Sequence, residues 1–343
     1  MTLRLVTFLF SFGLFISQVV GFLPFTPPVS VKRSFFLRAA ASVPFNEGNV
    51  TVYRTFDDQD EQEVKESYTL SYKIARPMSL SSRQAAPIVV LHGGPSVPSN
   101  YLYPLVDAIP YRSIIFYDQL GCGQSSEPQD INAYSIDKAI DDLEILLKKI
   151  GARRFHLYGQ SFGGILAFEY LKRVAERNNK IEGEGCLSVI LSSTPTNVKL
   201  VEEEAHRLHS QIKNENPEEE DESVVAEAFR QEHQCRTPEM PLPLQEAYQN
   251  AGTVWRGTDA IRDYVAKAVA QEETARMPSA MVLRGEHDFV TEVCVEGWSS
   301  KTDPLFNHKF VRSKTVEGCS HHGLLENEKM YGEMIDNYFA EYD

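Results

Sequence analysis

The strongest chemical signal in the chain is a serine set in a short glycine-rich turn. Residues 159–164 read G-Q-S-F-G-G, a G-x-S-x-G pattern centred on Ser161. The apolar residues 155–158 before it predict a buried strand, and residues 165–171 have the crowded apolar spacing of a core-facing helix. The two glycines that flank the serine fit a turn too tight for side chains. This context indicates a nucleophile elbow, which exposes the serine hydroxyl at the carboxyl end of a sheet.

A serine hydroxyl is a weak nucleophile, so Ser161 needs a histidine base and a carboxylate that orients this base. The carboxylate is expected just after an apolar strand. Residues 279–285 form such a strand, which ends in a glycine turn followed by Asp288. Glu286 is the weaker alternative, because it lies nearer to the strand. Asp288 could instead be an exposed loop residue without a catalytic role, but its position at the end of a strand makes this alternative weaker.

The base is expected in the loop after the last strand. Residues 309–316 predict that strand, and the following loop contains two adjacent histidines, His321 and His322. Only one of them can point at the carboxylate and the serine, and generic physics does not separate them. Cys319 lies in the same loop, but it has no elbow, so a thiol nucleophile is not favoured.

Backbone donors are expected beside the serine. The apolar strand 87–91 runs into H-G-G-P at 92–95. A backbone N–H of this loop, together with that of Phe162, would form an oxyanion hole for a tetrahedral intermediate. Glycine lets the backbone approach the substrate closely.

Together, these motifs resemble the proline iminopeptidase family of α/β-hydrolases. The resemblance rests on H-G-G-P at 92–95, D-Q-L-G-C-G-Q-S at 118–125 and the elbow at 159–164, and it extends from about Asn49 to the C-terminus. It also includes R-G-E-H-D at 284–288, G-C-S-H at 318–321 and a cap-like segment at 228–236.

The resemblance implies roles for individual residues. It selects His321 as the base and makes Gly94 and Phe162 the oxyanion donors. It implies a serine peptidase with the α/β-hydrolase fold. Asp118 is expected to organise its own turn and to take no part in the chemistry.

The chain departs from the family pattern at two places. Ser96 stands where the family usually has a further glycine, so the loop is expected to follow a slightly different path. Phe289 stands where a glutamate commonly binds the free amine of the substrate, and the cap region 250–258 has no acid. A buried ammonium needs a carboxylate partner, so strict aminopeptidase specificity is not expected unless another cap acid, such as Glu204 or Glu246, substitutes.

Alternating strands and helices predict an α/β fold with a mostly parallel sheet and an inserted helical cap. Residues 47–194 and 278–343 are assigned to the α/β-hydrolase core. Residues 195–277, which are acidic and helix-prone, are assigned to the cap. Within the core, Ser135 is expected to cap a helix that ends at Gly151.

The composition is that of an ordinary globular enzyme, with 343 residues of which 42% are hydrophobic and 24% charged. The net charge of −14 argues against a nucleic-acid partner. No metal-ligand spacing occurs, and no metal or cofactor is expected. The 5 cysteines include no C-x-x-C pair, so a disulfide framework is not expected.

Residues 1–46 are predicted to be a targeting leader. The apolar run 5–22 follows Arg4 and is typical of a cleavable signal, being short of a comfortable membrane span. Residues 22–46 contain no acid and mix basic residues with serine and alanine, as transit peptides do. Such a bipartite leader favours the plastid; secretion or an endomembrane lumen is the alternative, in which Asn49 would be a glycosylation acceptor. No stable membrane insertion is expected after leader removal.

The resemblance and the motifs thus predict a serine hydrolase like the proline iminopeptidases, an aminopeptidase that releases an N-terminal residue, proline or similar, from small peptides through an acyl-enzyme. A carboxylesterase or amino-acid amidase is the second hypothesis, favoured by the missing glutamates. A ligand-binding protein of the same fold without turnover is the third, and the intact set of Ser161, Asp288 and His321 argues against it. The sequence does not assign the substrate-binding residues.

Overall fold

A computed structural model of the chain describes residues 44–57, 63–77, 85–177, 185–215, 217, 219, 221–302, 304–306 and 310–343. Residues 1–43, which contain most of the predicted leader, lie outside the described residues, so plastid localisation remains a prediction. The first strand begins at Phe45, inside the range assigned to the leader. Within the described ranges, no helix is long and apolar enough to span a membrane.

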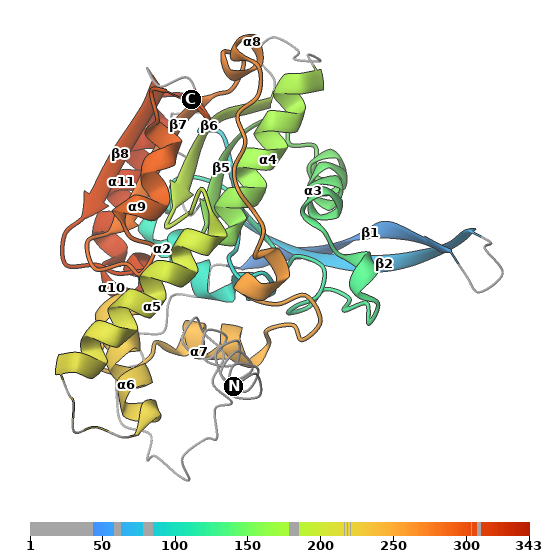
Figure 1. The fold of residues 1–343 in the computed structure, drawn as a ribbon. Coiled ribbons are helices and arrows are strands. Elements are labelled where there is room, and N and C mark those ends of the chain that lie inside the picture. The colour runs from blue at the N-terminus through green and yellow to red at the C-terminus, as the bar shows by residue number, and fades with distance from the viewer. Residues whose placement is uncertain are drawn as a thin grey trace.

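A mostly parallel sheet forms the centre of the molecule, as predicted (Figure 1). Its order is β1-β2-β4-β3-β5-β6-β7-β8; β1 pairs with β2 and β2 with β4 antiparallel, and the other neighbours are parallel. The strands are β1 (Phe45–Asp57), β2 (Glu63–Ala75), β3 (Ile88–Leu91), β4 (Ile114–Tyr117), β5 (Arg154–Gln160), β6 (Gly185–Ser192), β7 (Ser279–Gly285) and β8 (Val311–Val316). Parallel strands place their carboxyl ends at one edge, where ligands bind in open α/β sheets.

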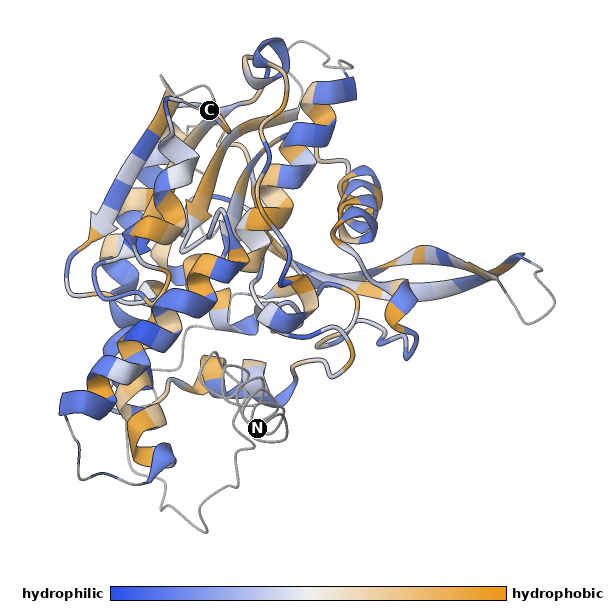
Figure 2. Cartoon of the chain, viewed as in Figure 1, coloured by the Kyte–Doolittle hydropathy of each residue, from blue (hydrophilic) through white to orange (hydrophobic). Residues whose placement is uncertain are grey.

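Helices cover both faces of this sheet. The core helices are α2 (Leu105–Ala108), α3 (Ile136–Ile150), α4 (Phe162–Arg177), α9 (Glu292–Val295), α10 (Gly323–Glu326) and α11 (Glu328–Ala340), with 3₁₀ turns η1 (Ser99–Leu102), η2 (Ile131–Ala133) and η5 (Glu296–Ser299). Successive β3 residues alternate between two hydrophobic clusters: Val89 packs with α3 and α4, and Val90 packs with α2 and α11. Figure 2 shows the result, with hydrophobic strands inside and polar outer sides on the helices.

The predicted helix with Ser135 at its start is confirmed as α3. The Ser135 hydroxyl accepts the Lys138 N–H over 3.1 Å, and Gly151 ends the helix with a φ of 66°. Arg54 of β1 binds Asp142 of this helix through contacts of 2.9 and 2.6 Å, with both side chains buried. This ion pair fixes α3 against the first strand.

The opening strand pair extends well beyond the residues whose polarity alternates. Strong alternation is confined to 50–54 and 68–73, but β1 and β2 each run for 13 residues. The extra part of β2 is exposed and includes Glu63 and Glu66, so no buried face gives it a sequence signal. Figure 1 shows this ribbon projecting from the body of the molecule.

Helices between β6 and β7 lie over the carboxyl edge of the sheet. They are α5 (Val198–Glu215), α6 (Glu222–Phe229), the π-helical turn η3 (Arg230–Gln234), α7 (Leu242–Gln249) and η4 (Thr258–Ile261). The helix α8 (Gln271–Thr274) lies apart from them, near the end of α4, where Arg276 donates to the Ala175 carbonyl over 2.9 Å (Figure 1). The range 195–277 assigned to the cap therefore includes a return segment that runs along the core.

A buried polar cluster joins the C-terminal Asp343 to the start of β5. Arg112 binds both carboxylate oxygens of Asp343, at 2.8 and 3.0 Å. His156 Nε2 lies 3.2 Å from the same carboxylate, and His156 Nδ1 lies 2.9 Å from the Ser188 hydroxyl. This Ser-His-Asp set resembles a triad, but His156 and Ser188 are fully buried at the end of the sheet opposite the elbow, so its role is structural.

We expect this cluster to make folding sensitive to mild acid. Burial lowers the pKa of His156 from 6.5 to about 4, so its stabilising contribution is complete above pH 6.5 and is lost as the pH falls toward 4. The loss reaches at most about 3 kcal/mol of unfolding free energy. Urea unfolding at pH 7 and pH 4.5 measures it, and His156→Gln should lose less stability over this interval. Equal losses in both proteins would contradict the assignment to His156.

Candidate active site

Ser161 lies in a strained turn between β5 and α4. Its φ of 54° is in the left-handed region, and its N–H donates to the Ser192 carbonyl over 2.8 Å. A Cβ on Gly159 would lie 2.5 Å from the Gly163 carbonyl oxygen, and a Cβ on Gly163 would lie 2.0 Å from the Leu91 carbonyl oxygen. The steric reason predicted for both glycines is confirmed, and the turn has the geometry of a nucleophile elbow.

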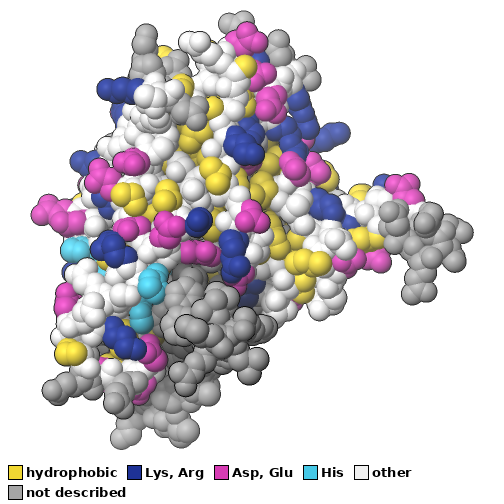
Figure 3. Space-filling model, in the orientation of Figure 1, with side chains coloured by type: hydrophobic (Ala, Val, Ile, Leu, Met, Phe, Trp, Pro, Cys, Tyr) yellow, Lys and Arg dark blue, Asp and Glu magenta, His cyan; other side chains and the backbone are white. Residues whose placement is uncertain are grey.

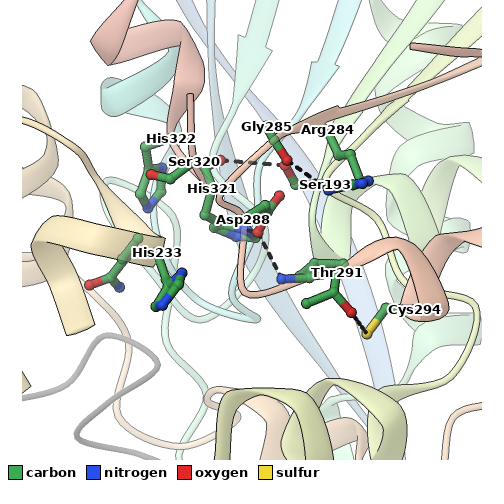
Figure 4. Close-up of polar contacts among 12 residues, drawn as sticks. Ser193, His233, Arg284, Gly285, Asp288, Thr291, Cys294, Ser320, His321 and His322 are labelled. Atoms are coloured by element: carbon green, nitrogen blue, oxygen red, sulfur yellow. Dashed lines mark hydrogen bonds and ion pairs between the residues drawn. The ribbon is translucent and has the colours of Figure 1, made fainter. Parts of the chain in front are cut away.

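The loops after β7 and β8 bring Asp288 and His321 together. His321 Nδ1 lies 2.9 Å from Asp288 Oδ1, and both side chains are buried (Figure 4). The Val290 N–H also donates to Asp288 Oδ1, over 2.8 Å. A carboxylate accepts, so this contact fixes the His321 proton on Nδ1 and leaves Nε2 as an acceptor.

His322 lies on the other side of the loop, away from Asp288 (Figure 4). Its Nε2 lies 3.2 Å from the Tyr248 hydroxyl of the cap, and its ring meets Tyr101 edge-on, with ring centroids 5.4 Å apart. Burial, with a smaller contribution from His321, holds the pKa of His322 well below its usual value. His322 is therefore a neutral packing and hydrogen-bonding residue.

The other residues that the sequence singled out lie elsewhere. Glu286 is exposed and accepts the Gly318 N–H over 2.9 Å. Cys319 is buried, which raises its thiol pKa to about 11. All five cysteines lie in the described ranges, and none is in a disulfide. Asp118 binds the Ser99 hydroxyl and the N–H groups of Ser99 and Gln124, so it organises its turn as expected.

The predicted oxyanion donors lie beside the elbow. Phe162 begins α4, where backbone N–H groups have no partner within the helix. Gly94 has a φ of 121°, and a Cβ there would lie 2.5 Å from the Ser96 nitrogen. Ser96 itself has a φ of 70°, and its hydroxyl donates to the Trp255 carbonyl of the cap. The departure at Ser96 therefore adds a hydrogen bond between the loop after β3 and the cap.

A cavity of about 50 Å³ lies over Ser161, with Phe162, Phe289 and His321 in its wall. Much of the wall is apolar, through Val97, Ile165, Val198, Val201, Ile261 and Val290. Its polar part comes from Tyr101, Gln160, Gln234, Tyr248, Thr258 and His322, and among the described residues that line it there is no carboxylate. The pocket is small compared with the roughly 300–1,000 Å³ typical of drug-sized ligands.

The cap carboxylates considered as amine ligands are placed outside this wall. Glu204 binds Arg207 through two contacts of 2.9 Å and accepts from the Thr291 hydroxyl. Glu246 is exposed. Glu202, on the same helix as Glu204, pairs with Arg262 at 3.7 Å. The structure thus offers no charged partner for an amine within the described cavity wall.

The π-helical turn η3 connects the cap to the loops after β7 and β8, which the sequence did not reveal. The His233 carbonyl accepts the N–H groups of Phe289 and His321, each over 3.3 Å, and the Gln234 carbonyl accepts that of His322 over 3.0 Å. Figure 4 shows His233 facing the His321 loop from the cap. The sequence predicts only a cap-like segment at 228–236. Backbone carbonyls carry no residue-type signal, so these contacts with the two loops could not be predicted.

The viewed face of the molecule carries Lys and Arg side chains interspersed with Asp and Glu (Figure 3). No single basic patch dominates this face. A phosphate backbone is bound by clustered positive charge, so this face has no feature of a nucleic-acid interface.

Comparison with known proteins agrees with the fold. The family model described as alpha/beta hydrolase fold matches residues 86–328, and the chain belongs to that family. Over 282 residues it is 29% identical to a proline iminopeptidase of Lactobacillus delbrueckii subsp. bulgaricus, an alignment that covers 75% of this chain and 91% of that protein. Over 179 residues it is 36% identical to a proline iminopeptidase of Saccharolobus solfataricus, covering 48% of this chain and 55% of that protein.

A solved structure gives the same result for the fold. The crystal structure of a proline iminopeptidase of Mycobacterium smegmatis matches 85% of this chain and 98% of its own, with a TM-score of 0.66 and 21% identity. The predicted fold class and the predicted resemblance to proline iminopeptidases are confirmed. The chain is a hydrolase-family protein similar to these enzymes.

Proposed function

We propose that the protein is a serine hydrolase that removes a small terminal acyl unit, such as a prolyl or alanyl residue, from a peptide, amide or ester. The pairing of His321 with Asp288 over 2.9 Å, beside a cavity that contains Ser161, is the observation that carries this proposal. The similar proteins named proline iminopeptidase support a terminal amino-acid residue as the acyl unit.

In the proposed reaction the Ser161 hydroxyl attacks the substrate carbonyl while its proton moves to His321 Nε2. The N–H groups of Gly94 and Phe162 stabilise the oxyanion, a contribution of about 3 kcal/mol or more for each donor. The His321 imidazolium, stabilised by Asp288, then gives the proton to the leaving amine or alcohol as its bond to the carbonyl carbon breaks. The acyl group remains bound to Ser161 as the acyl-enzyme. A water molecule then attacks the acyl-enzyme, with His321 again as base and acid, and the carboxylic acid product leaves Ser161.

The experiment that tests this proposal is labelling of the purified protein with a fluorophosphonate. The native chain should be labelled at Ser161, and Ser161→Ala should not be labelled. An unlabelled native chain would contradict the proposal and favour the binding protein without turnover. Fluorogenic prolyl, alanyl and simple acyl substrates then define the acyl unit.

We expect little benefit from a free substrate amine. The cavity wall contains no carboxylate among its described residues, and Phe289 stands where an acid is common in the family. Blocking the amine of a prolyl or alanyl substrate should change kcat/KM by less than about tenfold, or 1.4 kcal/mol. A loss of a thousandfold or more would contradict this expectation and point to a carboxylate that moves into the cavity.

A second candidate is a carboxylesterase or amidase that acts on simple acyl groups. The apolar wall around Val198, Val201 and Ile261 favours it, because such a surface binds an uncharged alkyl group by burial alone. A kcat/KM for a short-chain acyl ester that exceeds the value for the prolyl ester would select this candidate.

A further inference from the structure

Gln160, the last residue of β5, joins the oxyanion loop to His321 through a chain of hydrogen bonds. The Gly93 N–H donates to the Tyr101 hydroxyl over 2.8 Å, and this hydroxyl donates to Gln160 Oε1 over 2.6 Å. Gln160 Nε2 lies 3.1 Å from His321 Nε2. His321 Nδ1 in turn lies 2.9 Å from Asp288 Oδ1. The side chains that form this chain are all buried.

The Gly93 N–H at one end of this hydrogen-bond series and the Asp288 carboxylate at the other fix the direction of every bond between them. A backbone N–H only donates and a carboxylate only accepts. The Tyr101 proton therefore points to Gln160 Oε1, and the amide Nε2 of Gln160 is left to donate. His321 carries its proton on Nδ1, so its Nε2 has a single lone pair, which accepts from Gln160.

Ser161 needs the same lone pair, because His321 Nε2 must take its proton during attack. In this structure the Ser161 hydroxyl forms no hydrogen bond within the described part of the chain. The nucleophile and the neighbouring Gln160 therefore compete for one acceptor, and Gln160 occupies it.

His321 does not depend on Gln160 for its position. Asp288 holds Nδ1, the Phe289 ring lies against the imidazole with ring centroids 4.3 Å apart, and the His233 carbonyl accepts the backbone N–H over 3.3 Å. The Gln160 amide also has a second acceptor, the His321 carbonyl, at 3.5 Å. The amide can therefore release Nε2 without becoming unpaired.

We propose that Gln160 occupies the lone pair of His321 Nε2 in a resting arrangement, and that substrate entry exchanges this hydrogen bond for one from the Ser161 hydroxyl. In this exchange only hydrogen bonds change: the Gln160 amide turns to the His321 carbonyl, and the Ser161 O–H donates to Nε2. The inference rests on the proposed role of Ser161 as nucleophile.

Substitution Gln160→Met tests the proposal, because methionine has a similar length and no N–H donor. Loss of a resting-state hydrogen bond that has to break should speed fluorophosphonate labelling by about two- to tenfold. Gln119→Met is the matched control, since Gln119 is also buried but donates to the His92 carbonyl over 2.8 Å, and it should bring no acceleration. Labelling of Gln160→Met that is unchanged or slower would overturn the proposal.

Nitrogen NMR of histidine-labelled protein tests the same contact without turnover. The His321 Nε2 resonance should be the same in the native chain and in Ser161→Ala, and it should move in Gln160→Met. A resonance that moves in Ser161→Ala and not in Gln160→Met would show that Ser161 holds the lone pair, and would overturn the inference. A native chain without labelling would contradict the proposed function instead, and the NMR result would still decide the Gln160 contact.

Discussion

Ser161→Ala and His321→Ala are each expected to reduce kcat/KM by about 10⁴-fold or more, because the nucleophile and its base act as one unit. The geometry behind this expectation is the pairing of His321 with Asp288 and the exposure of Ser161 in the cavity. Hydrolysis of a fluorogenic prolyl or alanyl ester measures the loss. Unchanged melting temperature and circular dichroism would show that the fold is intact.

The neighbouring histidine provides the control for this prediction. His322 lies near the Tyr248 hydroxyl, and burial holds its pKa well below the usual value. His322→Ala should therefore keep at least about a tenth of the activity, a loss below about 1.4 kcal/mol in the barrier. An inactive His322→Ala together with an active His321→Ala would reverse the assignment of the base.

Much of the site could be predicted, because the relevant residues have side-chain-specific roles at the ends of strands. Ser161 and Asp288 follow the apolar runs that become β5 and β7, and His321 follows the more polar strand β8. The choice between His321 and His322 needed the family resemblance, since two adjacent residues in one loop share the same sequence signal. The structure separates them by their different partners, Asp288 and Tyr248.

The contacts that the sequence did not reveal depend on tertiary placement. The contact of Gln160 with His321 joins residues far apart in the chain, and the carbonyl of His233 binds two loops through backbone atoms. The return segment around α8 packs beside α4, and no sequence signal separates it from the cap. Hydrophobic periodicity and motif spacing indicate local structure and buried faces. The Gln160 contact, the His233 carbonyl contacts and the placement of the return segment leave both patterns unchanged, so the sequence does not predict them.

Gly163→Ala is expected to destabilise the fold by more than about 3 kcal/mol, because overpacking against rigid neighbours is costly. A Cβ at this position would lie 2.0 Å from the Leu91 carbonyl oxygen and 2.7 Å from that of His92. Both are backbone atoms of β3 and of the loop that carries the proposed oxyanion donor Gly94, so α4 or this loop has to move. Helix propensity acts in the opposite direction, since alanine within a helix is favoured over glycine by about 0.5–1 kcal/mol. The measured loss of unfolding free energy is therefore a lower limit for the steric effect.

Gly151→Ala is the matched control for this experiment. A Cβ on Gly151 would meet no atom within 4 Å, but the φ of 66° is strained for alanine, which costs about 1–2 kcal/mol. Urea unfolding should thus show a clearly larger loss for Gly163→Ala than for Gly151→Ala, and only Gly163→Ala should also lose fluorophosphonate labelling at temperatures where the protein is folded. If the two variants lose equal stability, the close approach of α4 to β3 is not what requires glycine in the elbow.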